Sequence, residues 1–214
     1  MEKAGKESVS MRYEVLDTIR GINLVSMILY HGMWDVVNFF HYDIPWYEGI
    51  PGYIWQQSIC WVFVLLSGFC WSIGRRKVLR GFQVFLAGLL VTMFTLIFMP
   101  EERIVFGILT FLGSAMLLMI PIEKMTTHVP AAAGMSGSFF LFLITKPVSM
   151  GFLGLCDLPL WRLPVGLYRN LLTTYLGFPE NNFFSNDYFP LIPWLFLFMM
   201  GQPTSERQND LKAC

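Results

Sequence analysis

Long apolar runs alternate with short polar connections along almost the whole chain. Because an α-helix rises about 1.5 Å per residue, roughly 20 apolar residues are needed to cross the hydrocarbon core of a bilayer. Six runs approach that length, and they cover residues 13–38, 53–73, 80–99, 104–121, 129–145 and 187–201. In the last and shortest run, Pro190 and Pro193 interrupt the first turns. The pattern predicts an all-α, polytopic transmembrane bundle of about six spans.

The connection before the last run is much longer than the others. It is rich in leucine, is interrupted by Pro159 and Pro164, and is long for a bare loop. We expect it to dip into the membrane interface or to cap the bundle, with a further short helix over residues 171–176. The predicted organisation is a leader over 1–12, a transmembrane domain over 13–201 with an outer loop at about 146–186, and a polar tail over 202–214.

The tail after Gly201 has no apolar periodicity. A truncated or frame-shifted product and a short cytoplasmic tail both remain open as interpretations.

Composition supports the membrane class. The 214 residues are 55% hydrophobic and 14% charged, whereas soluble domains are roughly 25% charged. The formal net charge is zero, so no global field favours a nucleic-acid partner. The four cysteines show no metal-ligand spacing, and no metal site is expected.

Lysine and arginine are distributed unevenly between the connections. The leader and the loop after the second run are basic, whereas the connections 41–52 and 100–103 are acidic or mixed. The positive-inside rule therefore predicts a multi-pass protein of the cell membrane with a cytoplasmic amino terminus. An even number of spans returns the tail to the cytoplasm.

One face of the first run carries four ionisable residues. At about 100° per residue, with Asp17 at zero, Arg20 lies near −60°, His31 near −40° and Asp35 near 0°. All four fall within roughly 60° of arc on one helix face. Ionisable groups at membrane depth are costly unless they face protein or water. The stripe therefore indicates a helix that lines a working site.

The stripe offers acid–base chemistry. Asp35 follows His31 by one turn, and a carboxylate beside an imidazole can orient it as a general base. A His–Asp pair that merely bridges helices is the structural alternative. Arg20 could hold an anionic group or simply pair with Asp17.

A basic cluster follows the second run. Arg75, Arg76, Lys77 and Arg80 form a positive-inside stop signal, and they would also suit an entering cofactor that is rich in phosphate.

Candidate acceptor contacts and packing positions lie further along the chain. The predicted contacts to a polar acceptor at the outer mouth are Asp187, Tyr188 and Trp194. Small residues at Gly107, Thr110, Gly113 and Ser114 recur at steps of three and four, which is typical of close helix packing. Ser67-Gly68-Phe69 has the same expected role.

Four segments resemble a known family. In order they are LDTIRGINLVSMILYHGMWDVV, VFVLLSGFCWSIGRRK, FGILTFLGSAMLL and SNDYFPLIPWLFLFMMG. Together they are similar to the bacterial branch of the heparan-alpha-glucosaminide N-acetyltransferase catalytic-domain family, over about Tyr13 to Gly201. The first segment also resembles the wider integral-membrane acyltransferase superfamily, in which an arginine precedes a histidine as Arg20 precedes His31.

The resemblance implies acyl transfer across a membrane. Cytoplasmic acetyl-CoA, or another acyl-CoA, would donate its acyl group to an amine or hydroxyl of an extracytoplasmic glycan. His31 would act as base or accept the acyl group, and Asp35 would orient it. Arg20 and the cluster at Arg75–Arg80 would contact the phosphates of the donor.

Two other functions stay open. A transporter could use the same stripe as a proton or solute relay, and an inactive, truncated remnant could only pack with partners. The expected partners are acyl-CoA, a glycan and the bilayer, and a homo-oligomer remains open.

Overall fold

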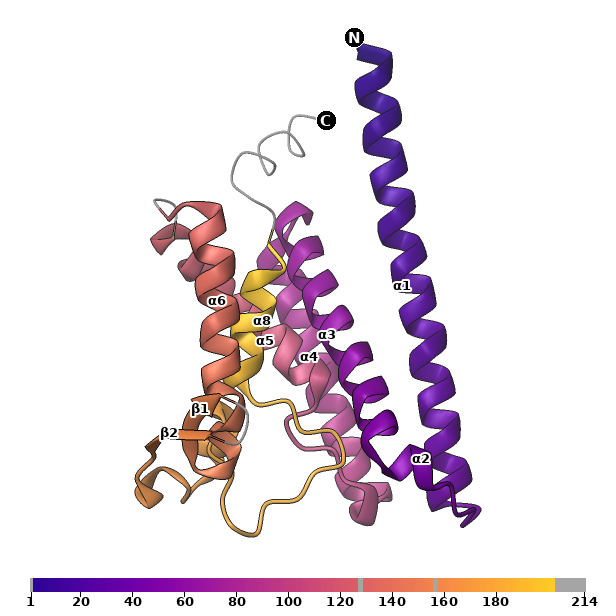
Figure 1. The fold of residues 1–214 in the computed structure, drawn as a ribbon, viewed down its shortest axis with the longest axis vertical. Helices are drawn as coiled ribbons and strands as arrows, with labels where there is room; N and C mark the ends of the chain where they lie inside the picture. The colour runs from indigo at the N-terminus through magenta and orange to yellow at the C-terminus, as the bar shows by residue number, and fades with distance from the viewer. Residues whose placement is uncertain (1, 127–128, 156–157, 203–214) are drawn as a thin grey trace. The chain divides into compact units, whose positions relative to one another are not determined.

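The computed structural model describes residues 2–126, 129–155 and 158–202, and these are mostly helical (Figure 1). The α-helices are α1 (Glu2–Asn38), α2 (Pro45–Glu48), α3 (Ile50–Ile73), α4 (Lys77–Phe98), α5 (Ile108–Met125), α6 (Ala131–Thr145), α7 (Leu171–Leu176) and α8 (Leu191–Met200). Short 3-10 turns cover Pro100–Glu102, Lys146–Met150 and Val165–Leu167. The strands are β1 (Phe152–Leu155) and β2 (Leu158–Arg162). Almost all of the predicted polar tail, 203–214, lies outside the described residues.

The chain forms two compact units. Unit 1 is Met1–Leu66 and unit 2 is Ser67–Cys214, so α3 contributes its first part to unit 1 and its last two turns to unit 2. Helix α1 begins at Glu2, so the residues predicted as a leader are helical and continuous with the first apolar run.

Unit 1 is built from α1 and the first part of α3, joined by α2. An aromatic cluster packs where the two long helices meet α2: the Tyr30 ring lies 5.2 Å from that of Tyr47 and 5.4 Å from that of Trp55, and Trp46 stacks on Trp55 at 6.2 Å. Tyrosine and tryptophan bury a large apolar area and also carry a hydrogen-bonding group, so this cluster stabilises the packing of the helices at this end.

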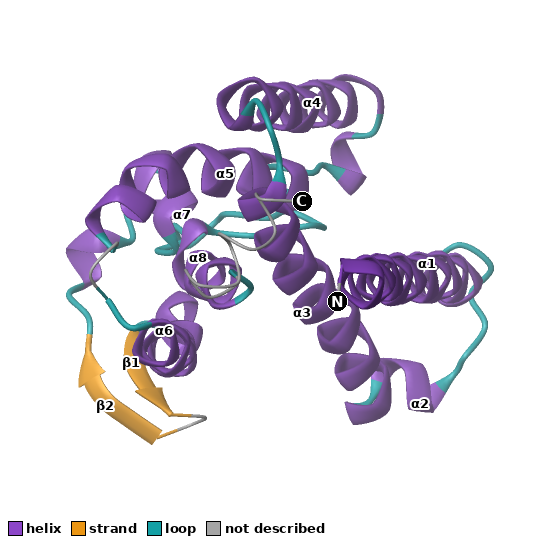
Figure 2. Cartoon of the chain, turned by 90° about the horizontal axis from the view of Figure 1, so that it is seen from above, coloured by secondary structure: helices purple, strands orange, loops and turns teal. Residues whose placement is uncertain are grey.

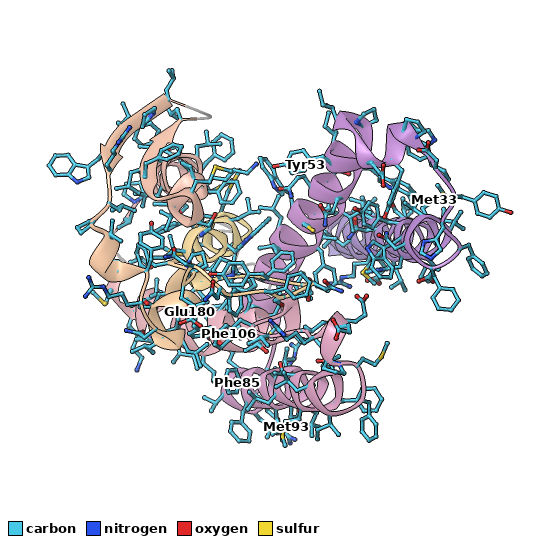
Figure 3. The ribbon with its side chains drawn as sticks, turned by 90° about the horizontal axis from the view of Figure 1, so that it is seen from below. Met33, Tyr53, Phe85, Met93, Phe106 and Glu180 are labelled. Atoms are coloured by element: carbon cyan, nitrogen blue, oxygen red, sulfur yellow. The ribbon has the colours of Figure 1, made fainter. Side chains whose placement is uncertain are left out.

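Unit 2 begins with the antiparallel pair α4 and α5. A Cβ on Gly113 would overlap the backbone of Phe85, so only glycine lets the two helices approach this closely. Figure 3 shows Phe85 on the inner side of α4 and Met93, which is 59% exposed, on the outer side. The predicted small-residue packing face is therefore confirmed.

Helix α8 lies between α5 and α6 and contacts both, as Figure 2 shows. A Cβ on Gly68 would overlap the carbonyl oxygen of Phe198, which confirms the packing role of Ser67-Gly68-Phe69. The indole Nε1 of Trp71 donates to the carbonyl of Met116 at 2.9 Å. The buried core contains Phe111, Phe142, Leu197 and Phe198.

The prediction of about six spans is not supported. Among the described helices, α3, α4 and α5 are long and apolar enough to cross a membrane. Helix α6 has 15 residues and α8 has 10, which correspond to roughly 22 and 15 Å against the ~30 Å hydrocarbon core. Helix α1 is long enough, but its polar residues keep it out of this set.

The all-α prediction is confirmed only in part: the described residues are mostly helical, but part of the long connection forms a β-hairpin. Strands β1 and β2 pair antiparallel, with Phe152 opposite Arg162 and Leu155 opposite Leu158. The predicted short helix over 171–176 is confirmed as α7. The proline break at the start of the last run is confirmed too, since α8 begins only at Leu191 and Ile192 is not helical.

The helices of unit 2 alternate in direction, so their connections gather at two ends (Figure 1). We call the end that carries Arg75, Arg76, Lys77 and Arg80 the basic end. We call the other end, with residues 99–107 and 158–190, the loop end.

Candidate functional site

The ionisable stripe lies on the exposed side of α1 in unit 1. Helix α1 is continuous from Glu2 to Asn38, so Asp17, Arg20, His31 and Asp35 keep the common face that the spacing predicts. All four are exposed within the described residues. Arg20 donates from Nη1 to Oδ1 of Asp17, so the ion pair, one of the two arrangements considered for Arg20, is present.

The face of α1 that contacts α3 is a different one. Asn23 donates to the carbonyl of Ile59 at 3.3 Å, and Trp55 donates to the hydroxyl of Ser26 at 2.8 Å. These contacts lie about 120° round the helix from the middle of the stripe, at 100° per residue. Packing inside unit 1 therefore leaves the stripe uncovered.

His31 sits beside the aromatic cluster. Its ring makes an edge contact with Tyr30, with centroids 6.2 Å apart. No hydrogen bond joins His31 to Asp35 in the part of the chain that the structure describes, although the two side chains leave one helix face one turn apart. Tyr47 donates to the carbonyl of Tyr30 at 3.2 Å, and burial raises the pKa of Tyr47 above its ordinary value. The imidazole of His31 is therefore exposed at the edge of this cluster, beside the ring of Tyr30.

At the basic end of unit 2, Lys77 contacts other side chains, whereas the three arginines are exposed. Lys77 Nζ lies 2.9 Å from Oε2 of Glu123 and 3.8 Å from the centre of the Trp71 ring. Arg75, Arg76 and Arg80 are exposed. The structure brings all four residues to one end, as their spacing predicts.

The three predicted acceptor residues are held in contacts at the loop end. Asp187 Oδ2 accepts a hydrogen bond from the backbone N–H of Ile108 at 2.9 Å, at the first residue of α5. Tyr188 donates to the carbonyl of Thr174 at 2.5 Å. These bonds stabilise the loop end itself.

Trp194 is the third of these residues, and it packs in an aromatic stack. Its ring centre lies 4.8 Å from that of Phe189 and 5.8 Å from that of Phe142. Residues 187–194 are therefore fixed against α5 and α6.

The loop end contains a segment that the sequence pattern did not predict, residues 184–189, which we call the strap. The segment 184–189 runs along 103–108, where Asn186 N–H donates to the Arg103 carbonyl at 3.1 Å and Phe189 N–H to the Phe106 carbonyl at 2.9 Å. The partners are about 80 residues apart, so no local pattern could reveal them.

Sequence patterns also did not predict a partly buried polar pair that joins α7 to α5. Tyr175 donates from its hydroxyl to the hydroxyl of Ser114, whose own hydroxyl donates to the carbonyl of Thr110 at 2.7 Å. Burial raises the pKa of Tyr175, although the bond to Ser114 opposes that shift.

The candidate residues thus fall into three groups on two units: the stripe on α1, the basic end and the loop end. Among the described residues, no group of three or more His, Cys, Asp or Glu could hold a metal ion. The chemistry that these groups offer is proton transfer by His31 and anion binding by arginine.

Comparison with known proteins identifies the family. The family model described as "Heparan-alpha-glucosaminide N-acetyltransferase, catalytic" matches residues 12–211. No curated protein and no solved structure matches the chain. Since the matched region covers nearly the whole sequence, the chain belongs to the heparan-alpha-glucosaminide N-acetyltransferase catalytic-domain family.

Proposed function

We propose that the protein transfers the acetyl group of acetyl-CoA, or the acyl group of another acyl-CoA, to an amino sugar or hydroxyl of a glycan. The donor would be cytoplasmic and the acceptor extracytoplasmic. The observation that carries the proposal is the family match over residues 12–211. The apolar helices α3, α4 and α5 support a membrane setting.

His31 is the proposed catalytic residue. The acceptor nitrogen or oxygen attacks the thioester carbonyl carbon, a C–N or C–O bond forms, and the C–S bond breaks. His31 takes the proton that the acceptor loses, and the sulfur of CoA leaves as a thiolate that is then protonated. The exposed position of the imidazole on α1 supports this role, because a base must reach the proton that it removes.

A two-step route uses the same side chain. The unprotonated imidazole nitrogen attacks the thioester carbonyl carbon, the C–S bond breaks, and CoA leaves as a thiolate that is then protonated. The acceptor attacks the acetyl carbon in turn, the C–N bond to the ring breaks, and the released imidazole takes the proton that the acceptor loses. In both routes Asp35 is a positioning residue, because it lies one helical turn from His31 and can accept a hydrogen bond from the imidazole N–H.

Arginine is the proposed partner of the donor's phosphates. Guanidinium groups bind phosphate through paired, charge-assisted hydrogen bonds. Arg75, Arg76 and Arg80 are exposed and suited to this role, whereas Lys77 is already engaged by Glu123. Arg20 could bind a phosphate by exchanging its partner Asp17.

The proposed role of Asp187, Tyr188 and Trp194 is on the acceptor side. Their contacts with α5, α6 and α7 support an indirect role, in which they hold the loop end in the shape that the acceptor meets.

The test is a transfer assay in sealed, inside-out vesicles. Labelled acetyl-CoA is supplied outside and a candidate amino sugar is trapped inside. We expect label in the trapped sugar, at a rate that depends on the protein. Proton-coupled solute flux without any acyl donor would instead support the transporter alternative. Transfer that occurs only when both substrates share one side would contradict the proposed sidedness.

A further inference from the structure

An exposed apolar surface covers the hairpin and the turns beside it. Its members are Met150, Leu158, Leu160, Trp161 and Val165, each between 65% and 74% exposed. We call these residues the hairpin surface. All five residues of β2 are exposed, so this strand is not buried against the rest of unit 2.

The hairpin lies beside a helix end and does not cover the bundle. Strand β1 contacts α6 and the turn Lys146–Met150. Figure 1 shows the hairpin at the lower end of α6, and Figure 2 shows it on the outer side of α6, away from α5 and α8. In a membrane protein, the space beside the end of an outer helix is the interface between headgroups and acyl chains.

Helix α6 supports the same placement. Its exposed apolar residues include Phe139, Phe140 and Leu141, so its outward face suits lipid and continues into the hairpin surface. The helix has 15 residues, and its length of roughly 22 Å falls short of the ~30 Å hydrocarbon core. An apolar segment at its end would add to the apolar length of α6.

The charges around the hairpin surface suit a lipid headgroup. Lys146, Arg162 and Arg169 flank it, against a single acidic residue, Asp157, between 146 and 179. Tryptophan and arginine both combine an apolar body with a polar tip, and they are favoured at membrane interfaces.

We propose that the hairpin surface inserts into the headgroup–acyl boundary of the bilayer that holds unit 2. Trp161 anchors it, and Arg162 and Arg169 contact lipid phosphates. This inference does not depend on acetyl transfer.

Site-directed spin labelling of the full chain in anionic vesicles tests the proposal. The four native cysteines are replaced by serine, and labels are attached after Leu160→Cys or Val165→Cys. Reference labels are placed by Phe94→Cys, on the exposed apolar side of α4, and by Glu101→Cys, in an exposed turn. Collision rates are measured with oxygen, which enters the acyl region, and with a water-soluble nickel chelate.

We expect the oxygen-to-nickel ratio at both hairpin labels to approach that of the Phe94 label and to exceed that of the Glu101 label. A ratio equal to that of the Glu101 label would overturn the proposal. Spin–spin broadening with low collision rates for both reagents would also overturn it, in favour of a second copy covering the surface.

A second measurement keeps all native cysteines. Lipids that carry bromine near the glycerol end quench tryptophan fluorescence on contact. We expect Trp161→Phe to lower the fraction of fluorescence that these lipids quench. An unchanged fraction would contradict insertion.

Discussion

Replacing Asp187 tests whether its carboxylate stabilises the start of α5. The side chain accepts a hydrogen bond from the backbone N–H of Ile108, one of the four N–H groups that a helix start leaves without partners. We expect Asp187→Ala to remove this bond and also the attraction between the negative charge and the helix dipole. Asp187→Asn is the matched control, because it keeps an acceptor oxygen and loses the charge.

The expected magnitude follows from these two contributions. Loss of a capping oxygen costs about 1 kcal/mol, and loss of a charge at a helix amino terminus costs roughly 0.3–1 kcal/mol. Asp187→Ala should therefore lower the free energy of unfolding by about 1–2 kcal/mol. Asp187→Asn should lower it only by the smaller contribution, roughly 0.3–1 kcal/mol.

The assay is equilibrium unfolding in mixed micelles, where the fraction of denaturing detergent is raised stepwise and helix content is followed by circular dichroism. Acetyl transfer by each variant is measured in parallel. An unchanged free energy of unfolding for Asp187→Ala would refute the capping role. Full stability together with lost transfer would point instead to direct contact with the acceptor.

Three further predictions concern packing, pH and the donor. Gly113→Ala should lower the free energy of unfolding of unit 2 by about 1–3 kcal/mol in the same assay, because α4 must move away from the added methyl group. The control is Gly137→Ala on α6, whose methyl group meets open space and should not destabilise the unit. Burial raises the pKa of Tyr175 above 10.0 in the folded state, so stability should fall as the pH rises above about 10, and less steeply in Tyr175→Phe. Arg75→Gln should raise the KM for acetyl-CoA by roughly 10- to 150-fold without changing stability, since a charge-assisted bond contributes roughly 1.5–3 kcal/mol. An unchanged KM would remove Arg75 from the donor site.

The helices of the fold follow from local pattern, and the exceptions have physical causes. Apolar runs over 53–73, 80–99 and 104–121 correspond to α3, α4 and α5, because a bilayer-length apolar run can satisfy its backbone only as a helix. The hairpin was not predicted, because its strands do not alternate polar and apolar residues. Pro159 inside β2 also argues against a strand, and it is tolerated here because β2 is an edge strand.

The candidate site was predictable only where it lies on a single helix. Spacing alone places Arg20, His31 and Asp35 on one face of α1, and the helix keeps them there. The bond from Ile108 to Asp187 joins residues 79 positions apart. It depends on where α8 packs, which propensity and periodicity do not determine.

His31 is the residue on which the proposed acetyl transfer depends most, and a paired substitution tests it most directly. His31→Asn and His41→Asn make the same chemical change at two exposed histidines of unit 1, and asparagine tolerates the left-handed backbone at His41. Label transferred from acetyl-CoA to a trapped amino sugar is measured for both variants at equal amounts of inserted protein. We expect His31→Asn to lose about 100-fold or more in rate, as removal of a general base does, and His41→Asn to match the wild type. Equal rates for the two variants would contradict the central role of His31.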